Sequence, residues 1–143
     1  MSILFGIHGN KDARSALDVP EDYDSSEWVA VCAYYAMYMA ASAALARVNY
    51  RSKNHSATVL ALETFFVDKQ LLEKKYVEII EKAQLEKDYV DGLNLARNKR
   101  EIAQYSVTKE TTRKIAVELK DDAYKFVERV ERLIHELDEA AEA

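Results

Sequence analysis

The cations between Asp91 and Glu101 are the residues of this chain whose types and spacing could do chemistry. Arg97, Lys99 and Arg100 lie in this stretch, and no acid stands among them. Arg97 and Arg100 are three residues apart, so on a helix they share a face and could hold one anion between two side chains. Patches of this kind contact phosphates. The alternative is a set of ordinary solvated arginines, and spacing alone favours that alternative.

A second cationic stretch holds Arg47, Arg51 and Lys53, with no acid before Glu63. These side chains form another candidate phosphate patch. His55 directly follows the loop, where it could cap the next helix or act on a phosphate. A structural role for His55 is the simpler interpretation.

Three tyrosines, Tyr34, Tyr35 and Tyr38, lie in one apolar segment at spacings that span more than one helix face. Aromatic rings can stack on nucleobases. More often such tyrosines fill a helical core and hydrogen-bond to neighbouring helices through their hydroxyl groups. Both interpretations stay open at the level of sequence.

The sequence lacks the motifs that nucleotide-binding loops and metal sites require. The chain has neither a glycine-rich loop ending in Lys-Ser or Lys-Thr nor a Gly-x-Gly-x-x-Gly motif. Its histidines are His8, His55 and His135, and none belongs to a Glu-x-x-His or His-x-x-x-His pair. Glu131 and His135 stand four residues apart, which is more often a surface hydrogen bond than half of a metal site. We therefore expect no metal and no other cofactor.

Length and charge point to one globular domain. The chain has 143 residues, enough to bury a core without a disulfide or a metal. Its net charge of −5 argues against a protein that binds nucleic acid over most of its surface, but it allows a local basic patch. The single Cys32 cannot form an intramolecular disulfide, and the N-terminus lacks the early cations and long apolar region of a secretory signal. We expect a cytoplasmic protein.

The segment from Trp28 to Ala46 holds nineteen residues without a charge, which approaches the length of a membrane span. Eight of the nineteen are alanine and three are tyrosine, whereas membrane insertion depends mainly on Leu, Ile, Phe and Val. We therefore expect a helix that is buried on most of its faces inside a bundle.

Three glycines and one proline in the whole chain favour helix almost throughout, so the predicted fold class is all-α. Residues 1–24 are expected to form an irregular N-terminal segment with at most a short helix around 11–17, and residues 25–143 a helical bundle. The helices predicted for that bundle cover residues 24 or 25 to about 48, 56–66, 71–96 with a kink or break near Asp91-Gly92, and about 108 to 137 or beyond.

Four segments carry a resemblance to a known family. They are Ala33-Tyr34-Tyr35-Ala36-Met37-Tyr38-Met39-Ala40-Ala41, His55 with Phe65-Phe66-Val67, Arg100-Glu101-Ile102-Ala103-Gln104-Tyr105, and Ala123-Tyr124-Lys125-Phe126-Val127. In order and spacing these segments resemble a small prokaryotic HEPN domain of the kind paired with minimal nucleotidyltransferases. The similarity covers about residues 25–137 and rests on the tyrosine-rich helix taken together with the Arg-to-Tyr segment.

The resemblance implies an up-and-down antiparallel bundle of four to five helices that forms a homodimer. It also implies a nucleotide or RNA ligand and a minimal nucleotidyltransferase as partner, in a pair resembling a toxin and its antitoxin. Active members are metal-independent endoribonucleases that carry an Arg, often followed by Asn, then a His and frequently a Tyr two positions later. Arg97-Asn98 and Tyr105 match the two ends of that motif, but Ala103 stands in place of the His. In some members a tyrosine near this motif receives a nucleotide, and Tyr105 is the candidate here.

Alanine cannot move a proton, and a phenol with a reference pKa of about 10 is a poor substitute for imidazole. We therefore expect a nucleotide- or RNA-binding module without ribonuclease activity. The expected binding residues are Arg97, Asn98, Arg100, Tyr105, Arg51 and Lys53. One alternative is a ribonuclease toxin that uses Arg97 or Arg100 with Tyr105 and His55. A second alternative is a helical scaffold whose arginines only form salt bridges to acids of the last helix.

Overall fold

The computed structural model describes residues 25–98 and 105–142, and within these ranges the chain is helical with no strand. Four α-helices are present: α3 (Ser26–Ala46), α4 (His55–Leu62), α5 (Lys74–Asn98) and α6 (Tyr105–Glu142). A π-helical turn, η1 (Glu63–Val67), continues α4. The prediction of an all-α bundle is confirmed. The short helix predicted around residues 11–17 lies outside the described residues.

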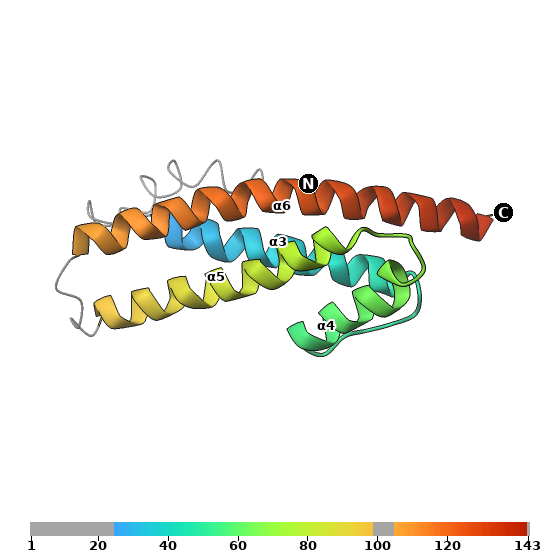
Figure 1. Ribbon diagram of the computed structural model, residues 1–143, viewed down its shortest axis with the longest axis horizontal. Helices are drawn as coiled ribbons and strands as arrows, with labels where there is room; N and C mark the ends of the chain where they lie inside the picture. The colour runs from blue at the N-terminus through green and yellow to red at the C-terminus, as the bar shows by residue number, and fades with distance from the viewer. Residues whose placement is uncertain (1–24, 99–104, 143) are drawn as a thin grey trace, which may run out of the picture.

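The three long helices lie side by side and alternate in direction along the chain (Figure 1). α3 and α6 run the same way, and α5 runs antiparallel to both. α3 packs most extensively against α6 and next against α5, so it is the central helix. The arm formed by α4 and η1 lies against α3 and α5. The C-terminal end of α6 extends past the other helices (Figure 1).

Small residues let α3 occupy the centre of the bundle. Ala30, Ala33, Met37, Ala41 and Ala44 are fully buried and recur at helical spacing along one stripe. Alanine side chains allow close approach of the neighbouring helices. Among the described residues, α3 is the one helix long and apolar enough to cross a membrane, and the central helix of a bundle has the same length and composition.

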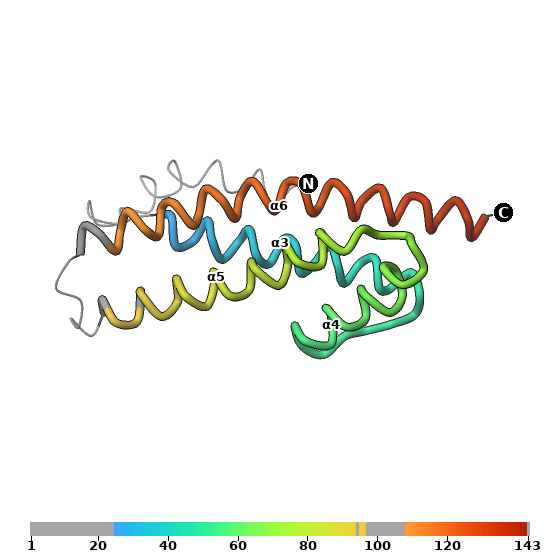
Figure 2. The backbone as a smooth tube through the Cα atoms, viewed as in Figure 1, coloured from blue at the N-terminus to red at the C-terminus, as the bar shows by residue number. Residues whose placement is uncertain are grey.

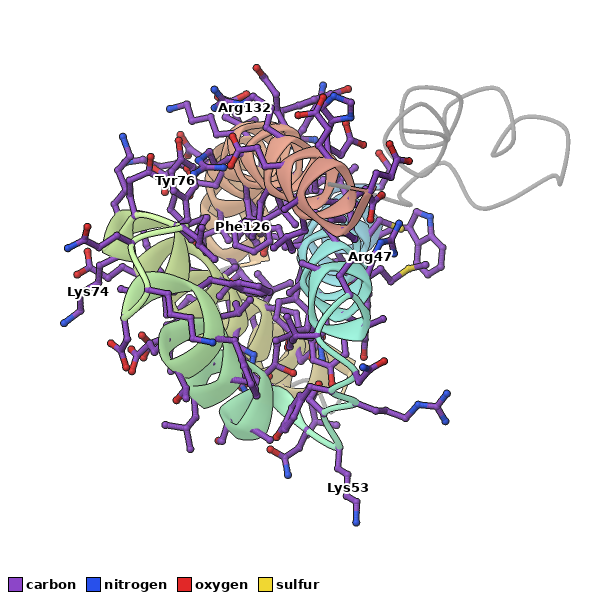
Figure 3. The ribbon with its side chains drawn as sticks, turned by 90° about the vertical axis from the view of Figure 1, so that its right-hand side faces the viewer. Arg47, Lys53, Lys74, Tyr76, Phe126 and Arg132 are labelled. Carbon is purple, nitrogen blue, oxygen red and sulfur yellow. The ribbon has the colours of Figure 1, made fainter. Side chains whose placement is uncertain are left out.

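Large side chains from the other helices complete the core. Phe66 of η1, Ile80 of α5 and Phe126 of α6 are fully buried, and Figure 3 shows Phe126 directed into the interior. Burying each such side chain stabilises the fold by about 1.5–3 kcal/mol. In α6 the residues Leu119, Ala123, Phe126, Val130 and Leu133 are buried and recur at helical spacing along one stripe.

Several helix boundaries differ from those predicted; α5 begins at Lys74 rather than 71, and α6 begins at Tyr105 rather than about 108. α3 ends at Ala46 rather than near 48, and Asn49 follows with a left-handed φ of 60°. Ser25 is the N-cap of α3, but its side chain makes no capping hydrogen bond. The helix predicted over 56–66 begins at His55 and turns π-helical at Glu63, where the Asp68 N–H donates to the Glu63 carbonyl five residues back at 2.8 Å.

The predicted break near Asp91-Gly92 is wrong, because α5 continues through both residues to Asn98. Val90 is buried in the core beside Gly92 and holds this part of α5 in place. The Lys87 ammonium also pairs with the Asp91 carboxylate at 3.0 Å, four residues on along the helix. Tertiary packing thus outweighs the loss of helix propensity at one glycine.

A buried arginine joins the start of α5 to α6. Arg129 of α6 is 9% exposed; its Nε donates to Glu73 Oε2 at 2.9 Å and its Nη2 donates to the Leu71 carbonyl at 2.9 Å. Its guanidinium also lies 6.0 Å from the ring centre of Tyr76. The remaining nitrogen, Nη1, is buried without a hydrogen-bond partner among the described residues. The connection between η1 and α5 is therefore fixed to the middle of α6.

Candidate functional site

The predicted Arg-to-Tyr site lies at one end of the bundle. α5 ends at Asn98, directly after Arg97, and α6 begins at Tyr105. Figure 1 shows that these two helix ends lie at the same end of the molecule, and the tube in Figure 2 follows the long helices α5 and α6 along that direction. The first turn of α6 contains no acidic residue, so the positive end of its helix dipole is not neutralised by its own side chains. Arg100 and Ala103 belong to residues 99–104, outside the described residues.

The sequence-predicted His55 occupies a different place, at the start of α4. It does not cap that helix: the Asn54 side chain does so, by accepting a hydrogen bond from the Ala57 N–H at 2.8 Å. His55 Nδ1 instead lies 2.9 Å from the hydroxyl of Tyr34 in α3. The rings of His55 and Tyr34 are 5.9 Å apart. This contact ties the α4 arm to the central helix.

Burial sets the protonation of this pair. It raises the pKa of Tyr34 to about 12, with smaller contributions in the same direction from Tyr38, Tyr35 and Asp88. It lowers the pKa of His55, against the opposing effect of Glu81 and Asp88. At neutral pH we therefore assign Tyr34 as the donor and His55 Nδ1 as the acceptor. The Nε2 of His55 then carries the ring proton.

The tyrosine-rich segment mainly serves the core. Tyr34 is 5% exposed and so cannot stack on a base, whereas Tyr35 is 47% exposed. The Lys87 ammonium lies 5.9 Å and 5.6 Å from the ring centres of Tyr34 and Tyr35 and pairs with Asp91. The hydrogen bond to Asp91 is the main reason that the pKa of Lys87 is raised. Tyr34 therefore fills the helical core and does not stack on a base.

His55 opens onto a cleft between α4 and α5 with a volume of about 440 Å³. The residues that line the cleft are His55, Ser56, Val59, Leu60, Glu63, Glu81, Gln84 and Leu85. Its charged side chains are carboxylates, and no Lys or Arg is among these lining residues. Such a cleft repels a phosphodiester.

Within one chain, His55 lies far from the predicted Arg-to-Tyr site. Leu85 of the His55 cleft and Arg97 are twelve residues apart on α5, which corresponds to about 18 Å along the helix axis. The structure therefore does not bring His55 together with Arg97 in one chain. It does bring the end of α5 and the start of α6, which carry Arg97, Asn98 and Tyr105, to a common end of the bundle.

The cations of the α3–α4 connection form a separate surface. Arg51 and Lys53 are exposed, and Figure 3 shows Lys53 directed away from the bundle. Arg47 is engaged elsewhere, since its Nε pairs with Asp138 of α6 at 3.0 Å. Because of this ion pair, we do not count Arg47 in the phosphate patch that the sequence predicted with Arg51 and Lys53.

No group of three His, Cys, Asp or Glu side chains in the described residues is arranged to hold a metal ion. The spacing of Glu131 and His135 suggested a surface hydrogen bond. His135 Nε2 lies instead 3.0 Å from Glu139 Oε1, four residues further along α6.

Sequence reasoning missed the acidic cleft. Its only local signal is Leu85, which stands out of phase with the buried residues Ile80, Ala83 and Val90 of α5 and is 69% exposed. Leu60 of α4 is 64% exposed on the same cleft. The two leucines line one cleft because the α4 arm lies beside α5. The spacing of apolar residues does not determine where that arm lies.

A central alanine-rich helix and two long partner helices define an all-α bundle, and the sequence-predicted anion site falls where α5 ends and α6 begins. A family model described as the HEPN domain matches residues 9–138. Because the match covers most of the chain, the protein belongs to the HEPN family, as the resemblance indicated. HEPN domains are known for functions related to nucleotides and RNA. No curated protein and no solved structure matched this chain.

Proposed function

We propose that this chain is a HEPN-type module that binds a nucleotide or RNA through Arg97, Asn98, Arg100 and Tyr105. The observation that carries the proposal is that α5 ends with Arg97-Asn98 and α6 begins with Tyr105 at the same end of the bundle. No acid interrupts the sequence between Asp91 and Glu101. A phosphate at this junction would be held by Arg97 and Arg100 and by the N-terminus of α6, whose first turn contains no acid.

The proposed role is binding without cleavage. A 2′-hydroxyl attack on the adjacent phosphate needs a group that moves a proton near neutral pH, and Ala103 cannot supply one. His55 is a poor replacement because Tyr34 holds its Nδ1, acidic residues surround its cleft, and about 18 Å of helix separates that cleft from Arg97. These observations favour the binding module over the ribonuclease alternative.

Several further features are proposed on the ground of the resemblance. We propose that the chain forms a homodimer, to which the exposed Trp28, Met39 and Val117 would contribute apolar surface. We propose a minimal nucleotidyltransferase as its partner in a toxin-antitoxin-like pair, with Tyr105 as the residue that receives a nucleotide. We also propose a cytoplasmic location, in keeping with the unpaired Cys32.

The test is incubation of the purified protein with a mixed RNA pool in the presence of a chelator. Wild type, Arg100→Ala and His55→Ala are compared by gel electrophoresis and by a filter-binding assay on the same samples. We expect retained RNA without cleavage for wild type and His55→Ala, and weaker retention for Arg100→Ala. Cleavage by wild type that either substitution abolishes would establish the ribonuclease alternative. Unchanged retention in Arg100→Ala would favour the scaffold alternative.

A further inference from the structure

We propose that the cleft between α4 and α5 is a docking site for a basic amphipathic helix of a partner protein. The proposal goes beyond RNA or nucleotide binding, because it concerns a surface that lies apart from the cationic α5–α6 junction. It rests on the exposed apolar side chains of the cleft and on the sign of its charge.

The apolar part of the cleft comes from two different helices. Leu60 of α4 is 64% exposed and Leu85 of α5 is 69% exposed, although both line the same cleft. Tyr89, one turn after Leu85, is 55% exposed and extends the apolar row along α5. Exposed apolar side chains that line a groove between two helices are the features by which an amphipathic helix is recognised.

The charged part of the cleft is acidic. Glu63 and Glu81 line it, and no Lys or Arg is among its described lining residues. His55 adds no positive charge at neutral pH, because burial lowers its pKa despite the nearby carboxylates of Glu81 and Asp88. Lys87 lies over the ring of Tyr35 and is paired with Asp91.

An occupant that places Leu-like side chains between Lys or Arg residues complements both features of the cleft. Its apolar side chains would cover Leu60 and Leu85, and its cations would meet Glu63 and Glu81. An RNA or an acidic segment would instead bring like charges together, which opposes binding. The observations therefore select a basic helix among the classes of partner.

The experiment measures binding of a labelled helical peptide to the full chain by fluorescence anisotropy. The probe has about 15 residues of Leu, Lys and Ala, with its leucines on one helix face. One comparison peptide replaces every Lys by Glu, and another has the same composition with the leucines scattered around the helix. The protein variants are Leu85→Ser and Glu81→Gln. Their matched controls, Leu95→Ser and Glu78→Gln, change exposed residues of α5 that do not line the cleft.

Wild type is expected to bind the basic amphipathic peptide at least about tenfold more tightly than either comparison peptide. Leu85→Ser should weaken this binding by about tenfold and Glu81→Gln by about fivefold, with the matched controls within about twofold of wild type. Absence of binding, equal affinity for the scattered-leucine peptide, or equal losses in the controls would overturn the proposal.

Two further measurements separate this proposal from other interpretations. A wild-type dimer that Leu85→Ser dissociates in analytical ultracentrifugation would assign the groove to a second copy of the chain and overturn the choice of a basic partner. RNA retention by Leu85→Ser is expected to equal that of wild type, since Leu85 lies about 18 Å along α5 from Arg97. A parallel loss of RNA binding would show that the two surfaces are not separate and would count against the proposal.

Discussion

The ion pair between Arg129 and Glu73 gives an unusual prediction: removing the exposed partner should cost more stability than removing the buried one. The side chain of Arg129 is 10% exposed and that of Glu73 is 55% exposed. Arg129→Met removes both 2.9 Å hydrogen bonds but leaves a carboxylate that water can solvate, so we expect a loss of about 2 kcal/mol. Glu73→Ala leaves a buried guanidinium without its counter-ion, for which we expect about 3 kcal/mol.

Urea unfolding followed by circular dichroism measures these losses. The double variant Glu73→Ala/Arg129→Met should be less destabilised than the sum of the single variants, by at least about 1.5 kcal/mol, because the second change removes the unpaired charge. The matched control is Glu78→Ala, an exposed acid of α5 with an expected effect below about 0.5 kcal/mol. If Glu73→Ala lowered the unfolding free energy no more than Glu78→Ala does, Arg129 would not depend on its counter-ion to join the start of α5 to α6, and the reasoning would be refuted.

Two further predictions concern His55 and Gly92. Because burial lowers the folded-state pKa of His55, its neutral form stabilises the fold fully above the ordinary pKa of 6.5, and this contribution is lost as the pH falls below 6.5. The unfolding free energy of wild type should therefore drop more steeply than that of His55→Gln between pH 7.5 and 5.5 in paired urea titrations, and parallel curves would contradict this. Gly92 is helical, and an added Cβ would meet nothing within 4 Å, so Gly92→Ala should raise the unfolding free energy by about 0.5–1 kcal/mol. A neutral or destabilising result in the same urea assay would mean that this position of α5 is not an ordinary helical site.

The composition and spacing of apolar residues were sufficient to predict the helices. The alanine-rich segment from Trp28 to Ala46 predicted a buried helix, and Ala30, Ala33 and Met37 of α3 are fully buried. The predicted break at Gly92 failed because propensity is a local property, while Val90 and the Lys87–Asp91 pair hold the helix through packing and charge. The change from α-helix to π-helix at Glu63 could not be predicted from the spacing of apolar residues.

The candidate site could be predicted only as a set of residues near one another in sequence. Arg97 and Tyr105 are only eight residues apart in the chain, so their placement where α5 ends and α6 begins follows from their closeness in sequence. His55 and Tyr34 are 21 residues apart, and their contact depends on how the α4 arm folds back on α3. The acidic cleft likewise depends on the position of α4 beside the middle of α5, which apolar periodicity does not specify.

The most direct test of the central claim is the salt dependence of binding to a single-stranded RNA. The comparison is between wild type, the double variant Arg97→Ala/Arg100→Ala, and the charge-matched control Lys74→Ala/Lys75→Ala, which changes exposed cations at the opposite end of α5. Each phosphate contact adds about 0.7 to the slope of log affinity against log salt, so loss of two contacts per chain should lower the slope by about 1.4. We predict that loss for the arginine variant, with the lysine control close to wild type. Equal slopes for the two double variants would contradict binding at the α5–α6 junction.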